Sequence, residues 1–284
     1  MTGATDAAST ARGLRLALTV WAVLLVVVLG AELLAPHDPA AILDPVRLRS
    51  QGPSWAHPLG TDPSARDVLS RLLVGARTSL ALALGAVAVG TSIGVLVGSA
   101  AALTGGVVDR ALMRLSEVVL AVPRVLLLLT LVALWQVRST AALVVVIGVT
   151  GWMATSRLVR DELRSALRDD RVLAARALGV PRRRLVQHHL LPAVLPLVAV
   201  TMTGAFAQVL LLEAGLSVVG LGVQPPEASW GSVLHDVSDV IGRARWLALG
   251  PGAVIMLTAL ATQRIGDVVQ QRLLIPHRSV PPGR

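Results

Sequence analysis

The stretch SLALALGAVAVGTSIGVLVGSAAAL, residues 79–103, runs for 25 residues without a charged side chain. A helix needs about 20 apolar residues to cross the roughly 30 Å hydrocarbon core of a bilayer. In that core the backbone satisfies its own hydrogen bonds as a helix or a closed barrel, and the stretch lacks the polar and apolar alternation of a barrel strand. It therefore predicts a transmembrane helix.

Five further apolar runs bring the predicted number of membrane spans to six. Of the 284 residues 54% are apolar and 15% are charged, a balance that is rare in water-soluble domains. Because the segments between the runs do not exceed about 45 residues, too few for an independent core, we predict one all-α, polytopic membrane domain. The spans are Leu14–Ala35, Ser79–Leu103, Leu115–Trp135, Thr140–Thr155, Leu191–Leu212 and Trp246–Ile265. The last span is expected to break near its start, at Gly250-Pro251-Gly252.

The missing residue types exclude several classes of chemistry. All 26 basic residues are arginine, so the chain has no lysine for a GxxxxGK[ST] phosphate loop or a Schiff base. The absence of cysteine excludes disulfides, thiolate nucleophiles and cysteine-based metal sites. The chain also lacks HExxH, GxSxG and paired catalytic carboxylates within a span. We therefore expect no enzyme, and no catalytic residue, metal or cofactor in this chain. The charge of +9 lacks interleaved aromatic residues, so nucleic acid is not an expected partner.

The arginines predict the orientation of the chain in the cell membrane. With the amino terminus inside, 17 arginines fall in inner segments, eight in outer segments, and Arg124 in the third span. The positive-inside rule then places both termini in the cytoplasm. The predicted parts are inner tails at 1–13 and 276–284, a transmembrane domain at 14–275, outer segments at about 36–77 and 213–245, and a long inner loop at 157–190. A cleaved signal peptide at the amino terminus is the alternative, but the first run is longer than a typical h-region and lacks an A-x-A-like end.

The inner loop combines arginines with a helical pattern. LVRDELRSALRDDRVLAARALG, residues 158–179, places leucines and alanines at helical spacing. Gly179 suits a left-handed helix terminus, and Pro181 cannot continue the helix. We predict a short helix, a sharp bend at Gly179 and an arginine-rich second helix that leads into Leu191-Pro192. An amphipathic helix lying on the membrane is the alternative.

Three motifs in this chain resemble one family. AARALGVPRRRLVQHHLLP, residues 174–192, is similar to the cytoplasmic EAA loop of binding-protein-dependent ABC importer permeases, where the proline of a closing LP stands thirteen residues after a glycine; Gly179 and Pro192 keep this spacing. HPLGTDPSARDVLSRLLVGARTSL, residues 57–80, and LLEAGLSVVGLGVQPPEASWGSVL, residues 211–234, resemble the DppC/OppC type of these permeases. The resemblance covers roughly residues 14–275.

The resemblance implies a type I ABC importer permease fold and transport of dipeptides, oligopeptides, nickel or other metal chelates. It implies three kinds of partner besides lipid: a DppB/OppB-like second permease, two cytoplasmic ATPase subunits or domains that bind ATP and Mg²⁺, and an extracytoplasmic substrate-binding protein. The loop would be the coupling helix that docks on the ATPase. Its predicted coupling residues are Leu173, Ala174, Ala175, Gly179, Arg182, Arg183 and Pro192. A secondary transporter or channel without ATPases is the alternative.

The loop departs from the family at its first motif position. Leu173 stands where the family has the leading glutamate, so an ion pair made by that glutamate is lost. Either Asp169 or Asp170, one helical turn earlier, compensates for it, or Leu173 docks as an apolar side chain. The neighbouring His188 and His189 point to different helix faces, so we do not predict a metal site there.

Within the spans, small, proline and charged residues carry further predictions. Gly90, Gly94 and Gly98 recur every fourth residue and predict a helix-packing stripe, either inside the subunit or against a second permease. Glu117 and Arg124 are two helical turns apart and are expected on one helix face near the inner interface. The prolines expected to bend or cap their helices are Pro123, Pro192 and Pro196.

The outer segments carry the remaining predictions. Glu213, in LLEAGLS, is expected to order the following turn or to line the exit of the cavity. The resemblance assigns this segment, which we expect to hold a loop and short helices, to an outer wall or gate where the substrate-binding protein docks. The residues predicted for it are Glu213, Gly220, Gly222, Pro225 and Trp230. In the other outer segment DVLSRLLVGARTSL, residues 67–80, is expected to lie at the membrane interface.

Overall fold

The computed structural model describes residues 2–238, 240, 242 and 244–274, and these residues form helices and loops without a strand. The predicted inner tail at 276–284 and the side chain of Arg182 lie outside the described residues. The long helices are α1 (Thr2–Leu34), α2 (Val68–Thr104), α9 (Leu191–Val218) and α11 (Arg245–Leu274). The shorter ones are α3 (Gly106–Ala121), α4 (Arg124–Leu134), α5 (Thr140–Val149), α6 (Trp152–Ala166), α7 (Asp170–Ala177), α8 (Arg182–Leu185) and α10 (Trp230–Ser238), with a π-helical turn at Val186–Leu190.

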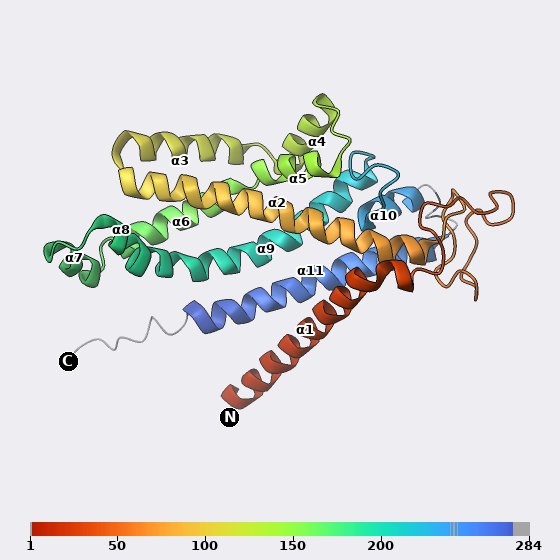
Figure 1. Ribbon diagram of the computed structural model, residues 1–284, viewed down its shortest axis with the longest axis horizontal. Coiled ribbons are helices and arrows are strands. Elements are labelled where there is room, and N and C mark those ends of the chain that lie inside the picture. The colour runs from red at the N-terminus through yellow and green to blue at the C-terminus, as the bar shows by residue number, and fades with distance from the viewer. Residues whose placement is uncertain (1, 239, 241, 243, 275–284) are drawn as a thin grey trace.

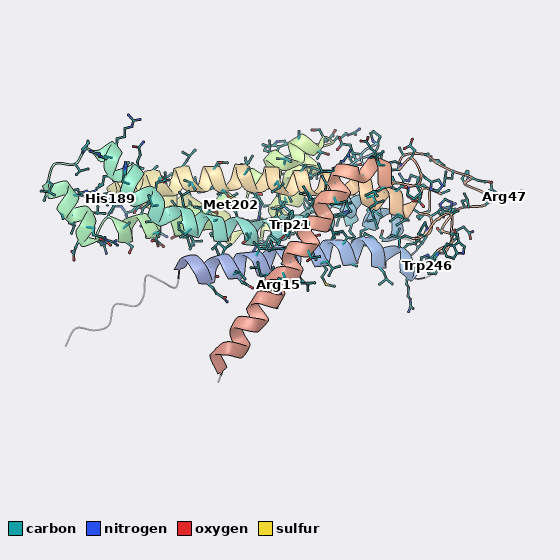
Figure 2. All side chains as sticks on the ribbon, turned by 60° about the horizontal axis from the view of Figure 1, so that its bottom comes forward. Arg15, Trp21, Arg47, His189, Met202 and Trp246 are labelled. Carbon is teal, nitrogen blue, oxygen red and sulfur yellow. The ribbon has the colours of Figure 1, made fainter. Side chains whose placement is uncertain are left out.

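The helices form an elongated bundle with two different ends (Figure 1). We call the end that carries α7, α8 and the π-helical turn, residues 167–190, the α7 end. The opposite end, which carries the loop at residues 35–67 together with residues 219–244 and α10, is the α10 end. Figure 2 shows His189 at the α7 end and Arg47 and Trp246 at the α10 end. Helix α1 begins at Thr2, inside the predicted tail, and leans away from the bundle toward its amino terminus.

The six predicted spans are confirmed, with two of them bent. Four apolar helical stretches are long enough to cross a membrane singly, at Gly13–Leu34, Val68–Thr104, Arg183–Val218 and Arg245–Gln271. The other two spans are the pairs α3 with α4, which meet at 86°, and α5 with α6, which meet at 43°. Each pair is long and apolar enough for one span when both helices are counted together.

Pro123 explains the sharper of the two bends. It has no backbone N–H, and it disfavours the helical conformation in the residue before it. Val122 is accordingly extended (φ −88°, ψ 128°), and α4 begins directly after the proline. Glu117 and Arg124 thus lie on different helices, and the prediction that they share one helix face was wrong. Glu117 pairs with Arg114 at 3.0 Å.

The predicted break in the last span was also wrong, because α11 runs through Pro251 from Arg245 to Leu274. Proline is tolerated inside membrane helices where neighbouring groups satisfy the backbone groups it leaves free. Gly250 lies close to α2: a Cβ there would come within 3.1 Å of Leu72 Cδ1. The glycine therefore lets α11 approach α2 where a break was expected.

Helix α2 forms the centre of the bundle. It packs against α5 and α6 along one side and against α1, α9 and α10 elsewhere. Arg77 fixes α1 to α2, since its Nε donates to the Val28 carbonyl at 2.6 Å and its guanidinium pairs with Glu32 at 2.5 Å. The largest fully buried side chains of the core are Trp230, Leu82, Leu128, Leu143, Ile147, Leu190, Leu210 and Leu247.

Candidate functional site

The segment between α6 and α9 has the predicted order of helix, bend and helix. Asp169 caps α7, because its side chain accepts a hydrogen bond from the Arg171 amide at 2.9 Å. Its carboxylate also pairs with the Arg171 guanidinium at 3.0 Å, and these bonds lower the pKa of the Asp169 carboxyl. Asp169 is therefore engaged inside the segment, one turn before Leu173.

Gly179 makes the bend. Its φ of +75° lies in the left-handed region that suits glycine, and a Cβ would meet nothing within 4 Å. The Val180 amide donates to the Ala175 carbonyl at 3.1 Å and the Gly179 amide to the Arg176 carbonyl at 3.0 Å, which closes the end of α7. The chain then turns through Pro181 into α8, the π-helical turn and α9.

The exposure of this segment changes over a few residues. Leu178 is 85% exposed and Leu173 is 48% exposed, while Val172, Leu185 and Leu190 of the same segment are buried. Ala174, Gly179, Arg183 and Pro192 are exposed as well, and Ala175 is half-buried. Apolar side chains held in the open on a buried base are typical of a binding surface.

A cavity of about 1770 Å³ opens beside this segment, between α1, α6, α9 and α11. His188 and His189 both line it, together with Asp169 and Arg171. His188 Nδ1 donates to the Arg184 carbonyl at 3.1 Å, whereas the buried Nδ1 of His189 has no hydrogen-bond partner. The α7 end is thus hollow on one side, and both polar and apolar residues line the hollow.

Asp109 anchors the helix that leads into the segment. It is buried on α3 and accepts from Arg160 Nη2 at 2.9 Å and from Arg164 Nη2 at 2.7 Å, both on α6. Asp109 therefore ties α3 to α6, the helix that precedes α7. No local pattern in the sequence indicates this contact, since Asp109 lies 51 residues from Arg160 and belongs to no motif.

The three glycines of α2 face α5 and α6 of the same subunit. A Cβ on Gly90 would come within 2.9 Å of the Gly148 carbonyl, and one on Gly94 within 2.9 Å of the Trp152 carbonyl. A Cβ on Gly98 would come within 2.9 Å of Val159 Cβ. These positions form a close backbone contact that a side chain would open.

At the α10 end, Glu213 orders the segment that follows it. Its buried Oε1 accepts from Ser217 Oγ at 2.8 Å and from Ser229 Oγ at 2.7 Å. Gly222 and Gly231 leave room for this contact, because a Cβ on either would collide with Ser217 Oγ. The carboxylate therefore ties both ends of the loop at 217–231 to α9.

The same loop is tied to α2 by Trp230. The Trp230 amide donates to Ser79 Oγ at 2.9 Å, and the indole Nε1 donates to the Leu72 carbonyl at 3.0 Å. Gly220 has a left-handed φ of +83° at the end of α9, and the Pro225-Pro226 bond is cis. The expected loop and short helix are observed, with α10 as that helix.

A buried ion network joins the two loops of the α10 end. Asp62 Oδ2 pairs with Arg66 at 2.8 Å and with Arg71 at 2.6 Å. Asp236 Oδ2 pairs with the same two arginines, at 2.8 Å and 2.5 Å. Arg71 is buried in the first turn of α2, and the position of residues 67–80 at the membrane interface stays a prediction. The network supplies the charges that make the burial of Arg71 tolerable.

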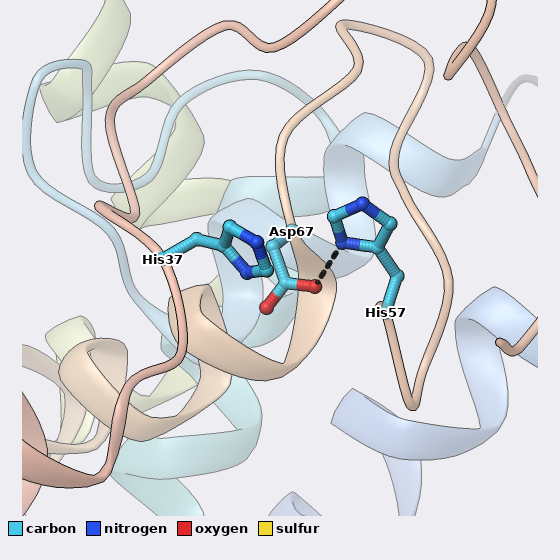
Figure 3. A group of neighbouring side chains, drawn as sticks. All are labelled: His37, His57 and Asp67. Carbon is cyan, nitrogen blue, oxygen red and sulfur yellow. Dashed lines mark hydrogen bonds and ion pairs between the residues drawn. The ribbon is translucent and has the colours of Figure 1, made fainter. Parts of the chain in front are cut away.

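Beside this network lies a cluster of His37, His57 and Asp67 (Figure 3). One ligand-type atom from each lies within 4.8 Å of the others. Asp67 Oδ1 accepts from His57 Nδ1 at 2.9 Å, and Asp67 Oδ2 accepts from the Ser70 amide at 2.8 Å and from Ser70 Oγ at 2.7 Å. Because both carboxylate oxygens are engaged, hydrogen bonding accounts for the cluster as the N-terminal cap of α2.

Comparison with known proteins identifies relatives of this chain. The family described as "Binding-protein-dependent transport system inner membrane component" matches residues 90–275. A Brucella suis biovar 1 (strain 1330) protein with the provisional name of peptide permease is 37% identical over 246 residues, which cover 86% of this chain and 80% of that protein. A protein of Brucella ovis with the same provisional name has the same identity and coverage.

A solved structure confirms the predicted fold. The chain is similar to the MetNI methionine ABC transporter in inward-facing conformations, with a TM-score of 0.57 and 20% identity. The match covers 71% of this chain and 95% of that chain. The fold is therefore that of a type I ABC importer permease.

Proposed function

Because the chain belongs to the inner membrane components of binding-protein-dependent transport systems, we propose that it forms half of the translocation pathway of an ATP-driven importer for peptides. A second, DppB/OppB-like permease forms the other half. Peptide cargo is supported by the names of the Brucella relatives. Nickel or another metal chelate is the alternative cargo, and a competition experiment against the peptide must exclude it.

The α7 end is the proposed docking site for the ATPase subunits, which bind ATP and Mg²⁺. The observation that carries this proposal is the exposed apolar tip, Leu173 and Leu178, in a segment whose Val172, Leu185 and Leu190 are buried. A groove on an ATPase would cover the two leucines, and Arg183 is placed to pair with carboxylates around that groove. Closure of two ATPases then moves α7, and Asp109 passes the movement from α6 to α3.

The orientation follows from the same proposal. With the α7 end in the cytoplasm, the amino terminus of α1 and the end of α11 at Leu274 also point to the cytoplasm, since both point toward the α7 end (Figure 1). The α10 end then faces outward, where the substrate-binding protein docks. The Glu213 contacts and the ion network hold that surface in one shape for its partner.

The test is purification of the tagged subunit, with its partners, in mild detergent. Wild-type protein should bring both the second permease and the ATPases, and the complex should accumulate labelled dipeptide in vesicles that contain ATP and face a peptide-loaded binding protein. Leu178→Ala should release the ATPases and retain the second permease. Val46→Ala is the matched control, because Val46 is 90% exposed at the opposite end.

Three results would contradict parts of this proposal. Uptake by the purified chain without ATPases would support the secondary transporter or channel instead. ATPase recovery that is equal for Leu178→Ala and wild type would remove the α7 end as the docking site. Nickel that competes with the dipeptide for uptake would change the proposed cargo.

A further inference from the structure

Arg124 lies where both bent spans break. It is the first residue of α4, directly after the 86° bend between α3 and α4. Its Nη2 donates to the Ile147 carbonyl at 2.8 Å, near the end of α5, just before the 43° bend between α5 and α6. One guanidinium thus bridges the two broken helices.

Arg124 lines a partly open cavity of about 380 Å³ between α2, α9 and the two breaks. Ala86 and Gly90 line it near the midpoint of the 37-residue helix α2, and Thr201 lines it near the midpoint of the stretch Arg183–Val218. The cavity therefore lies about half-way along both of these long helical stretches. Thr91 and Gln208 add further polar groups.

Arg124 has no countercharge in the described part of the chain. None of the ion pairs among the described residues includes it, and its buried Nε has no hydrogen-bond partner. A charge in a membrane is normally paired, and a buried N–H without a partner is destabilising. The Ile147 carbonyl engages one of the five N–H donors of the guanidinium. The remaining donors match an anion.

Local backbone geometry keeps the guanidinium in this place. Gly151, at the bend between α5 and α6, faces it so closely that a Cβ would come within 2.8 Å of Arg124 Nη2. A side chain at residue 151 would therefore push the guanidinium out of its position. The site therefore combines a cation held in a fixed position, a glycine that leaves space beside the cation, and a cavity.

We propose that this cavity is an anion site in the transport pathway, in which Arg124 receives the carboxylate of the cargo. The inference rests on the proposed function and specifies where a peptide binds in the membrane. A free peptide carries a terminal carboxylate, which a guanidinium binds through two parallel hydrogen bonds. The cavity volume lies in the lower part of the roughly 300–1,000 Å³ range of small-ligand pockets, which suits a dipeptide.

The test measures the rate at which phenylglyoxal modifies Arg124. The complete transporter is held in phosphatidylcholine nanodiscs, and the modified residue is located by mass spectrometry. Alanyl-alanine should slow the modification about tenfold at about ten times its Kd, because a bound carboxylate shields the guanidinium. The amide alanyl-alaninamide at the same concentration should not. Arg114, whose side chain is exposed, is the internal reference and should react equally in all samples.

Several outcomes overturn the inference. Equal protection by the dipeptide and its amide, or by neither, removes the carboxylate site. If Arg124 is protected when the nanodiscs contain phosphatidylglycerol and no peptide is present, the site binds a lipid phosphate. These outcomes do not depend on transport, so they leave the proposed function standing if uptake and ATPase binding are normal.

Uptake by two variants supplies the second measurement. Arg124→Gln should lower dipeptide uptake about tenfold or more, the loss expected when a charged hydrogen-bonded pair worth about 1.5–3 kcal/mol is removed. Arg114→Gln, the matched control one helix earlier, should transport as wild type. Unchanged uptake by Arg124→Gln contradicts the proposal. ATPase recovery is measured in parallel, so that a loss of assembly is separated from a loss of cargo binding.

Discussion

The two ends of the bundle differ in how their side chains are paired and buried. At the α10 end, Asp62, Arg71 and Asp236 are buried or half-buried and pair with one another. At the α7 end, Leu178 is exposed, and Gly179 shapes a bend that nothing else in the described chain covers. The α10 end is therefore held by a buried ion network, whereas the α7 end presents an exposed apolar tip next to a glycine bend.

The largest effect on the free energy of unfolding is expected at the buried ion network of the α10 end. Asp62→Asn replaces a buried carboxylate and leaves Arg66 and Arg71 with half of their countercharge. Removing one member of a buried ion network costs about 3–5 kcal/mol, because the charges that remain are still desolvated. Thermal unfolding in detergent, followed by circular dichroism, measures the loss.

The matched control for that change lies on the same loop. Asp44→Asn alters a solvent-exposed pair, with Arg47 at 3.9 Å, and should change the free energy of unfolding by less than about 1 kcal/mol. If the two variants unfold at the same temperature, the network does not stabilise the α10 end, and the contrast between the ends is lost.

A smaller effect is expected in the middle of the bundle, which connects the two ends. A Cβ on Gly94 would come within 2.6 Å of Thr155 Cβ, so Gly94→Ala should cost about 1–3 kcal/mol by forcing α2 and α6 apart. Gly204→Ala is the control, because nothing lies within 4 Å of its Cβ, and alanine in a helix is favoured over glycine by up to about 1 kcal/mol. The two variants should thus shift the melting temperature in opposite directions. Equal shifts contradict a close α2–α6 contact.

The same comparison separates what the sequence could predict from what it could not. The spacing of Gly90, Gly94 and Gly98 predicted a packing stripe, and Gly179 with Pro181 predicted the bend, because these patterns are local. Asp62 and Asp236 are 174 positions apart, and no local pattern shows that they meet at Arg71.

The errors at the helix breaks have a similar origin. Pro123 and Pro251 look alike in the sequence, yet the first breaks a span and the second lies inside α11. The difference depends on the neighbouring helices: α11 continues past Gly250, which packs on Leu72, whereas α4 turns away from α3 and exposes Arg124 to a cavity. Tertiary contacts decide the outcome, and a single sequence does not contain them explicitly.

At the α7 end, Gly179→Val should cost about 1–2 kcal/mol, because a β-branched residue is strained at a φ of +75°. This cost is confined to α7 and α8, so the melting temperature of the bundle should change little. The uptake of dipeptide per ATP hydrolysed should fall, since α7 no longer holds its angle to α8. Gly179→Asn should retain uptake, because asparagine tolerates the left-handed region. Normal uptake by Gly179→Val contradicts a lever at the α7 end.

The smallest effect on stability is expected at Leu178. Leu178→Ala removes a side chain that is 85% exposed, so the free energy of unfolding should stay within about 0.5 kcal/mol of wild type. Leu190→Ala is the contrast in the same segment, because Leu190 is buried and its truncation should cost about 2–5 kcal/mol. If Leu178→Ala unfolds as wild type but loses the ATPases, the leucine acts through a partner. If its loss destabilises the isolated chain as Leu190→Ala does, the tip belongs to the core and is not a docking surface.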